Sequence, residues 1–186
     1  MVTVGVLALQ GGAREHLALI ESLGGKAIAV KKQSDLGDID ALIIPGGEST
    51  TISKLLTVFE LKKPVGDFID AGNPVLATCA GLILLATEVD GEPGYFQKLP
   101  IKVKRNAYGA QLASAEAIVD YQQGSENAAF IRAPKILDSG DSEVVGKVSD
   151  EVVAIRNGNI MAASYHPELT NSTMLHRKLL EMAASN

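Results

Sequence analysis

Short apolar runs that end in turns of glycine and other small residues dominate the first half of the chain. Three such runs, at 2–9, 41–44 and 74–78, are each followed by Leu and Ile residues at helical spacing. Runs of this kind are typical of strands buried on both faces of a parallel sheet, because a helix must return the chain to the same edge. The sequence therefore predicts an α/β fold with a mostly parallel central sheet flanked by helices.

The second half is rich in short apolar runs separated by Gly, Asn and Asp, a pattern that favours strands. We expect strands at 101–104, 115–119, 128–131, 144–148, 152–155 and 160–164, an amphipathic helix at 172–184, and an irregular insertion at 87–100. No internal repeat or linker divides the chain. We therefore expect a single domain over residues 1–186 with a β-rich second half.

Composition narrows the functional classes. A net charge of −5 and a pI near 5.2 argue against a nucleic-acid-binding surface, so no nucleic-acid partner is expected. No apolar run approaches the roughly 18 residues of a membrane span, and no leader precedes the first strand, so we expect a cytoplasmic protein without membrane contact. A single cysteine excludes an internal disulfide, and the three histidines show no metal-ligand spacing, so no metal site is expected.

The single cysteine, Cys79, follows the apolar run 74–78 and precedes a second apolar run that reads as a helix. A side chain at a sharp strand-to-helix turn is presented at the edge of the sheet, where helix N–H groups favour a thiolate. Ala77 and Gly81 on either side are small enough for such an elbow. The alternative is an inert buried cysteine, since free Cys is often buried.

A second loop, P-G-G-E-S-T-T at 45–51, also follows a predicted strand. Gly46 and Gly47 allow close approach of a ligand to the backbone, and Ser49 or Thr50 is expected to cap the following helix. A phosphate-binding loop is the competing hypothesis, but no lysine follows the glycines. Backbone donors beside a thiolate suit an oxyanion better. Loops 10–12, 45–51 and 78–81 are expected to converge at one sheet edge.

His166 and Glu168 follow the last predicted strand and flank Pro167. Proline is expected to hold this segment extended, so that both side chains point to the same side as a base and its orienting carboxylate. An ordinary surface turn is the alternative, since Pro and Glu are mostly exposed. Together with Cys79, the three residues form the pattern expected of a thiol nucleophile.

These motifs resemble those of class I, triad-type glutamine amidotransferases, and in particular the glutaminase subunits of pyridoxal 5′-phosphate synthase. The matching segments are G-V-L-A-L-Q-G at 5–11 with Glu15 and His16, P-G-G-E-S-T-T at 45–51, T-C-A-G-L at 78–82, R-N-A-Y-G at 105–109, I-R-A-P at 131–134 and H-P-E-L-T at 166–170. The resemblance covers nearly the whole chain. It implies a flavodoxin-like fold, L-glutamine as substrate, and no cofactor.

By this resemblance Cys79 is the nucleophile, His166 the base and acid, and Glu168 the residue that orients the imidazole. The glutamine-binding positions implied are Gly46, Gly47, Glu48, Ser49, Arg105, Ile131 and Arg132. For the oxyanion hole we choose the backbone N–H groups of Gly47 and Ala80. The chain departs from the family pattern at Ala77, where glycine is usual, and at Ala110 and Ala115, where an arginine and an aromatic residue are more usual.

The resemblance also implies a partner, the synthase subunit that accepts ammonia. Gln10, Arg14, Glu15 and His16, at the sheet edge that carries Cys79, are our candidates for the partner interface. Two alternatives remain from the residues alone: another elbow-type cysteine hydrolase or peptidase, and a noncatalytic regulatory subunit of the same fold.

Overall fold

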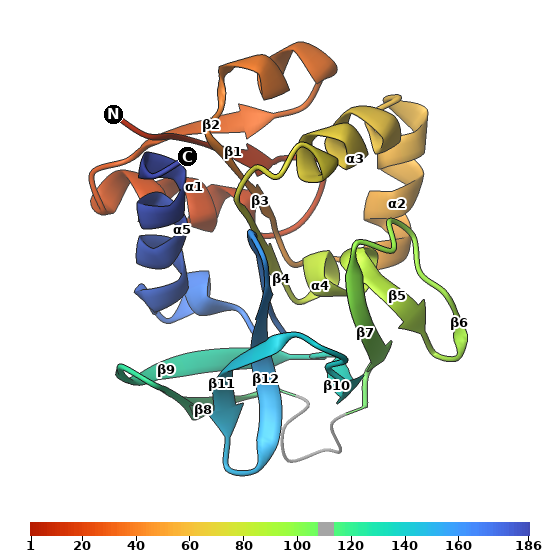
Figure 1. Ribbon diagram of the computed structural model, residues 1–186, viewed down its shortest axis with the longest axis vertical. Coiled ribbons are helices and arrows are strands. Elements are labelled where there is room, and N and C mark those ends of the chain that lie inside the picture. The colour runs from red at the N-terminus through yellow and green to blue at the C-terminus, as the bar shows by residue number, and fades with distance from the viewer. Residues whose placement is uncertain (108–113) are drawn as a thin grey trace.

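The computed structural model describes residues 1–107 and 114–186, and within them nine strands form one twisted sheet through the middle of the molecule (Figure 1). In spatial order they are β2 (Lys26–Val30), β1 (Thr3–Leu7), β3 (Ala41–Ile44), β4 (Val75–Thr78), β13 (Ile160–Ala163), β12 (Glu151–Asn157), β11 (Glu143–Val148), β8 (Ser114–Tyr121) and β9 (Gly124–Ile131). Neighbours from β2 to β13 pair in parallel, and those from β13 to β9 pair antiparallel. The sheet is thus mixed, with its parallel half built mainly from the first part of the chain, and the expected α/β class is confirmed.

Helices cover both faces of the parallel half. On one face lie α1 (Ala13–Ser22) and α5 (Met174–Ala184), and on the other lie α2 (Ser49–Val58), α3 (Lys62–Asp70) and α4 (Ala80–Leu85) (Figure 1). Successive side chains of a strand point to opposite faces, which explains why adjacent residues of β3 join different cores. Ile43 packs in the cluster beneath α1 and α5, whereas Leu42 and Ile44 pack in the cluster beneath α2 and α4.

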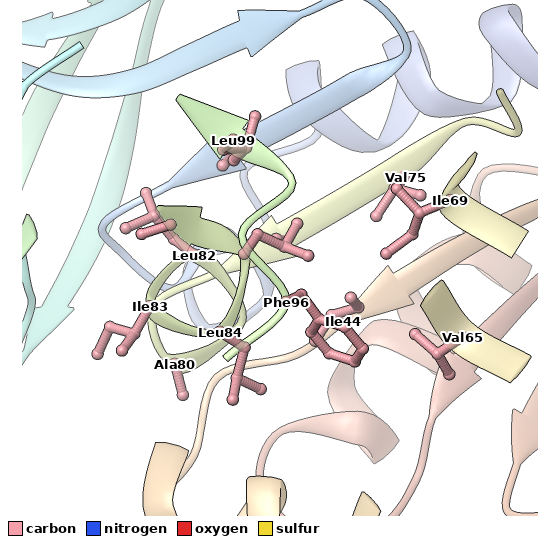
Figure 2. Packing of buried hydrophobic residues seen from close by; sticks show 14 of the residues in the cluster. Ile44, Val65, Ile69, Val75, Ala80, Leu82, Ile83, Leu84, Phe96 and Leu99 are labelled. Carbon is pink, nitrogen blue, oxygen red and sulfur yellow. The ribbon is translucent and has the colours of Figure 1, made fainter. Parts of the chain in front are cut away.

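The cluster beneath α4 also joins the main sheet to a second, smaller one (Figure 2). Its strands are β10 (Lys135–Asp138), β7 (Leu99–Lys104), β5 (Ala86–Val89) and β6 (Glu92–Pro93). Leu82 of α4, Leu99 of β7 and Phe96 are buried together in this cluster. The smaller sheet therefore supports the helix that follows Cys79.

The expectation of an irregular insertion at 87–100 is wrong. Strands β5 and β6 form an antiparallel hairpin whose two-residue turn, Asp90-Gly91, has positive φ at both positions. Asp-Gly is a favoured sequence for such a turn, because both residues tolerate positive φ. The dipeptide was therefore the signal from which this hairpin could have been predicted.

Besides β5 and β6, four elements have no counterpart in the expectations from sequence: the 3₁₀ segments η1 (Gln33–Asp38) and η2 (Pro167–Leu169), helix α3 and strand β10. Helix α3 contains Pro64 and Gly66, which both disfavour helix on propensity. Pro64 lies in the first turn, where proline is tolerated, and Val65 and Ile69 bury one face of the helix. Among the residues that the structure describes, no helix has the length and apolar character to cross a membrane.

Candidate active site

The three loops that follow β1, β3 and β4 converge at one edge of the sheet, as the sequence predicted. They meet in a cavity of about 320 Å³. Its lining residues are Gln10, Gly47, Glu48, Ser49, Cys79, Ile83, Arg105, Asn106, Ile131, Arg132 and His166. Most of the side chains singled out in the sequence therefore surround one volume.

Cys79 lies at the turn between β4 and α4 in a backbone conformation that is rare for any residue other than glycine, with φ of 47° and ψ of −102°. Such conformations cost on the order of 1–3 kcal/mol and persist only where the surroundings impose them. The Cys79 N–H donates to the Ala163 carbonyl oxygen at 2.8 Å, which ties the turn to β13. The residue is only 5% exposed, but its Sγ opens on the cavity, 4.0 Å from the carbonyl oxygen of Ile131.

Two glycines allow this turn to be closely packed. A Cβ on Gly81 would lie 2.1 Å from the Ile44 carbonyl oxygen, so α4 approaches β3 more closely than any side chain allows. A Cβ on Gly46 would lie 2.3 Å from Cε1 of His166 and 3.2 Å from Cβ of Cys79. The backbone of Gly46 therefore packs directly against both side chains. Ala77 is fully buried within β4, and the elbow forms with alanine at this position.

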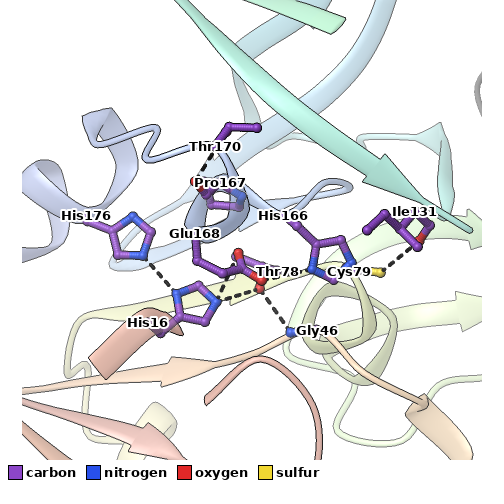
Figure 3. Close-up of polar contacts among 10 residues, drawn as sticks. All are labelled: His16, Gly46, Thr78, Cys79, Ile131, His166, Pro167, Glu168, Thr170 and His176. Atoms are coloured by element: carbon purple, nitrogen blue, oxygen red, sulfur yellow. Dashed lines mark hydrogen bonds and ion pairs between the residues drawn. The ribbon is translucent and has the colours of Figure 1, made fainter. Parts of the chain in front are cut away.

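His166 and Glu168 do not lie in an extended segment, so that expectation is wrong. Residues Pro167–Leu169 form a 3₁₀ turn, because Pro167 at its start fixes a φ suited to a helical turn. Nδ1 of His166 nevertheless lies 2.9 Å from Oε1 of Glu168 (Figure 3). The backbone N–H of His166 donates to the Ala129 carbonyl oxygen at 2.8 Å, and Glu168 is only 6% exposed. The alternative of an ordinary surface turn is therefore wrong.

The surroundings of His166 favour its protonated form. Burial lowers the pKa of His166, but the hydrogen bonds to Cys79 and Glu168 outweigh burial and raise the pKa to about 10. A positively charged imidazole beside a sulfur atom stabilises the thiolate over the thiol. The imidazolium of His166 therefore lies between the sulfur of Cys79 and the carboxylate of Glu168.

The loop after β3 is held by the loop after β1. The Gly12 N–H donates to the Gly46 carbonyl oxygen at 3.1 Å, and the Glu48 N–H donates to Oε1 of Gln10 at 2.8 Å. A Cβ on Gly47 would lie 2.5 Å from the same Gln10 oxygen. The position of the 46–48 backbone thus depends on Gln10 and its neighbours.

Glu48, and not Ser49 or Thr50, is the N-cap of α2, which corrects the expected cap. Its Oε1 accepts from the Thr50 N–H at 3.4 Å and from the Thr50 hydroxyl at 3.2 Å. The Thr50 backbone, more than any other group, holds the pKa of Glu48 below its usual value, and Arg132 adds to this. Oε2 of Glu48 lies 3.0 Å from Nη2 of Arg132, so opposite charges face each other at the rim of the cavity.

Arg105 and Ile131 reach the cavity from two different sheets. Arg105 follows β7, where its N–H donates to Oδ1 of Asp90 at 2.9 Å and its Nε lies 3.4 Å from Oδ2. Ile131 ends β9 and precedes Arg132, whose φ of 47° turns the chain at the cavity. The antiparallel half of the sheet therefore supplies one wall. Asn106 also lines the cavity, although sequence reasoning did not single it out.

Of the candidate interface residues, Gln10, Arg14 and Glu15 are exposed, whereas His16 is wholly buried. A surface contact by the His16 side chain is therefore excluded, and that expectation is wrong. His16 lies behind Glu168, with Nε2 3.3 Å from Oε2 of the carboxylate (Figure 3). Helical periodicity gave the signal, since Leu19 and Ile20, at i+3 and i+4 from His16, are buried on the same face of α1.

Of the two remaining departures from the family pattern, the structure describes only the one at Ala115. Ala110 lies outside the described residues. Ala115 is on β8, where its register partner on β9 is Phe130. Within the described residues, no group of three or more His, Cys, Asp and Glu side chains is arranged to hold a metal ion.

Comparison with known proteins identifies a family for this chain. Residues 6–185 match the SNO glutamine amidotransferase family. Pyridoxal 5′-phosphate synthase subunit PdxT of Clostridium beijerinckii is 50% identical over 173 residues, covering 90% of this chain and 91% of that protein. The subunit of the same name from Brevibacillus brevis is 45% identical over 183 residues, covering 96% of both chains.

Solved structures show the same architecture. A crystal structure of a glutamine amidotransferase superposes with a TM-score of 0.90 at 42% identity, over 97% of this chain and 98% of that chain. PurLQS from Thermotoga maritima, at 14% identity and a TM-score of 0.75 over 97% of this chain and 98% of that chain, shares the fold alone. The chain therefore belongs to the SNO glutamine amidotransferase family.

Proposed function

We propose that residues 1–186 form a single glutaminase domain that hydrolyses L-glutamine to L-glutamate and ammonia. The observation that carries the proposal is the half-buried His166, which is hydrogen-bonded to Glu168, has its pKa raised to about 10 and lies beside Cys79 in a cavity. Membership of a glutamine amidotransferase family points to the same substrate. No cofactor is required, since thiol and imidazole suffice for amide hydrolysis.

In the proposed reaction the Cys79 thiolate attacks the side-chain amide carbon of glutamine. The negative charge on the amide oxygen is stabilised by N–H groups of Gly47 and of Ala80, the first residue of α4, whose N–H has no acceptor within the helix. His166 donates its proton to the leaving nitrogen, ammonia departs, and a γ-glutamyl thioester remains on Cys79. His166 then takes a proton from water, whose oxygen attacks the thioester, releasing glutamate and restoring the thiolate.

The ionic groups at the rim suit the two charges of an amino acid. Glu48 and Arg132 pair with each other across the cavity, and a zwitterion could replace that pair with one contact to each. In this proposal Arg132 or Arg105 holds the α-carboxylate and Glu48 the α-ammonium, with Gly46, Gly47, Ser49 and Ile131 shaping the site. Arg132→Lys should raise KM for glutamine more than it lowers kcat, because lysine keeps the charge and loses the two-pronged geometry. Unchanged KM in both Arg105→Lys and Arg132→Lys would refute the carboxylate role.

Ammonia release from glutamine is the direct test. Wild-type protein should release ammonia from glutamine and not from peptides, and Cys79→Ser should abolish the reaction while leaving the fold intact, because the substitution changes little volume. A thiol-alkylating glutamine analogue should add one label per chain, at Cys79. Cleavage of peptides in preference to glutamine would instead assign the chain to the cysteine peptidases, and activity of Cys79→Ser near that of wild type would refute the nucleophile.

Relatives are named as subunits of pyridoxal 5′-phosphate synthase, so we propose that the ammonia passes to a separate synthase subunit within a hetero-oligomeric complex. The exposed side chains of Gln10, Arg14 and Glu15 are the proposed contact surface. Gln10 supports this choice, because it hydrogen-bonds the backbone of the loop assigned to the oxyanion. Co-purification of the two subunits, lost on substitution of these three residues, would test the surface.

A further inference from the structure

The three histidines of the chain lie in one line of contacts, which continues past His166 into the buried interior (Figure 3). Oε1 of Glu168 contacts His166, and Oε2 of Glu168 lies 3.3 Å from Nε2 of His16. Nδ1 of His16 lies 2.8 Å from Nε2 of His176 on α5. His16 and His176 are both fully buried, and neither lines the cavity around Cys79.

Both additional histidines are neutral at physiological pH. Burial, followed by the nearby His176 and His166, holds the pKa of His16 well below its usual value. Burial also lowers the pKa of His176 to about 4, although Glu126 and the Ser172 backbone act in the opposite direction. A neutral imidazole carries one N–H donor and one acceptor nitrogen, so each ring must adopt one of two tautomers.

The carboxylate of Glu168 decides which tautomer His16 adopts. Oε2 of Glu168 is buried and makes no well-aligned hydrogen bond among the described residues. A buried carboxylate oxygen without a donor is costly, so a proton on the facing Nε2 of His16 is favoured. Nε2 also lies 3.2 Å from Oγ1 of Thr78, which in turn accepts from the Gly46 N–H at 3.1 Å.

The tautomer of His16 determines that of His176. With its proton on Nε2, His16 presents Nδ1 as an acceptor, so His176 must donate from its own Nε2 across the 2.8 Å contact. Nδ1 of His176 then carries a lone pair. It makes no hydrogen bond of good geometry among the residues described, although the Ser172 backbone lies close enough to the ring to raise its pKa. In this arrangement the donors run in one direction, from His176 through His16 toward the facing oxygens of Thr78 and Glu168.

We propose that His16 is a positioning residue for the hydrolysis proposed above: neutral, with its proton on Nε2 facing Glu168 and with Nδ1 accepting from His176, it holds the second oxygen of Glu168 so that the first stays on His166. The inference rests on the proposed function. It adds His16 and His176, which do not touch substrate, to the group formed by Cys79, His166 and Glu168. His16 belongs to α1, which begins directly after loop 10–12. The same side chain therefore connects that helix to Glu168 and, through Thr78, to the loop at Gly46.

The tautomer is measurable in the unaltered protein. Long-range ¹H–¹⁵N NMR of the ring nitrogens should show both His16 and His176 neutral at pH 7 with protons on Nε2. A proton on Nδ1 of His16 would overturn the proposal, because Nε2 would then turn a lone pair toward Glu168. This measurement needs no variant and no activity.

A matched pair of variants tests the kinetic role. His16→Gln places an amide N–H near the position of Nε2, whereas His16→Leu has similar bulk and no donor. His16→Leu should lower kcat for glutamine hydrolysis on the order of tenfold with KM unchanged and should lower the pKa of His166, and His16→Gln should restore most of both. Equal kcat and equal His166 pKa in wild type and His16→Leu would refute the positioning role.

A double-mutant cycle tests whether His16 acts through Glu168. In a Glu168→Gln background, His16→Leu should cause little further loss of kcat, because the group it positions is already altered. If the kcat loss of the double variant equalled the product of the losses in His16→Leu and Glu168→Gln alone, the proposal would be overturned in favour of a general packing role. If wild type hydrolysed no glutamine, the proposed function would fail, and the tautomer and the His166 pKa would still decide whether His16 positions Glu168.

Discussion

His166 owes its charge to two neighbours of different kinds. Burial alone would keep the imidazole neutral, but Cys79 on one side and Glu168 on the other stabilise the cation. Because the folded pKa is raised, protonation stabilises the folded chain fully below the unfolded value of 6.5. That contribution is lost as the pH rises through about 10. The imidazolium form of His166 is therefore present across the physiological range.

Replacing the Cys79 sulfur should weaken the stabilisation of this cation. Cys79→Ser replaces an ionisable sulfur by a neutral hydroxyl, so the pKa of His166 should fall below the value of about 10 that it has beside Cys79. NMR titration of the His166 ring in wild type and variant measures the change. An unchanged pKa would mean that Glu168 alone holds the proton and that Cys79 is not its ionic partner.

How far the sequence predicts a residue's place depends on how local its surroundings are. Cys79 could be placed, because an apolar strand, a turn and a helix adjoin it in the chain. His16 could not be tied to Glu168, because its partner His176 comes from a helix 160 residues away and the contact exists only once α1 and α5 pack on the same face. Helical periodicity could have predicted only that His16 is buried.

At the scale of elements, two helical glycines with opposite surroundings test how tightly α4 is built. A Cβ on Gly81 would lie 2.1 Å from the Ile44 carbonyl oxygen, whereas a Cβ on Gly66 of α3 would meet no atom within 4 Å. Gly81→Ala should therefore destabilise the chain by on the order of 1–3 kcal/mol. Gly66→Ala should stabilise it by about 0.5–1 kcal/mol, because alanine favours the helix. Urea unfolding measures both, and a change of the same sign in the two variants would contradict the packing described.

The first N–H groups of helix α5 are capped by a side chain from strand β9 and not by the helix's own N-cap residue. Glu126 of β9 accepts from the N–H groups of Thr173 and Met174 at 3.0 and 3.1 Å, and also from the Ser172 hydroxyl. Burial raises the pKa of Glu126, but these hydrogen bonds outweigh it and lower the pKa. The resulting stabilisation is present above the unfolded value of 4.5 and is lost as the pH falls through the lower folded pKa.

Glu126→Gln should accordingly destabilise the chain by about 1–2 kcal/mol, since one acceptor oxygen becomes a donor facing other donors. The matched control is Glu116→Gln on the neighbouring strand β8, where the side chain is exposed and contacts only Asn127 among the hydrogen bonds of the described residues. We expect it to change stability by less than about 0.5 kcal/mol. Unfolding at pH 7 compares the two, and equal losses would exclude a cap of α5 by Glu126.

Elements were predictable where pattern and propensity agreed. The parallel strands and α1, α2 and α5 follow from apolar spacing, whereas α3 forms against the propensities of Pro64 and Gly66 because tertiary packing buries Val65 and Ile69. The prediction of an extended segment at Pro167 was wrong because proline is compatible with both an extended segment and a helical turn. The contacts of Glu168 decide between the two.

At the scale of the whole molecule, the cavity joins two halves of the sheet that are built differently. The parallel half contributes the loops after β1, β3 and β4, and the antiparallel half contributes Ile131 and Arg132 and anchors His166 through Ala129. Such a site is complete only when strands distant in the chain are in register. It is also open to control from outside, because loop 10–12 is both exposed and bonded to loop 46–48.

That control leads to the last prediction, which concerns the synthase subunit proposed as partner. Glycine adopts either sign of φ, so a rotation of the Gly46–Gly47 peptide is allowed by its own backbone, and it would break the 3.1 Å bond from the Gly12 N–H. A protein docked on loop 10–12 could therefore bias the oxyanion hole. The chain alone should therefore hydrolyse glutamine slowly and more rapidly with the partner bound. Gln10→Ala should reduce the stimulated rate more than the basal rate, because its side chain fixes the Glu48 N–H.

The control is Lys63→Ala on α3, whose side chain is exposed on the opposite face of the sheet from α1 and should leave stimulation intact. Rates are compared at a partner concentration that saturates each variant, so that weaker docking is not mistaken for weaker activation. Equal rates with and without the partner would remove the case for a switch. Equal stimulation of Gln10→Ala and Lys63→Ala would mean that partner docking is not coupled to the active site through Gln10, because the side chain of Gln10 would then not control the backbone at Gly46 and Gly47.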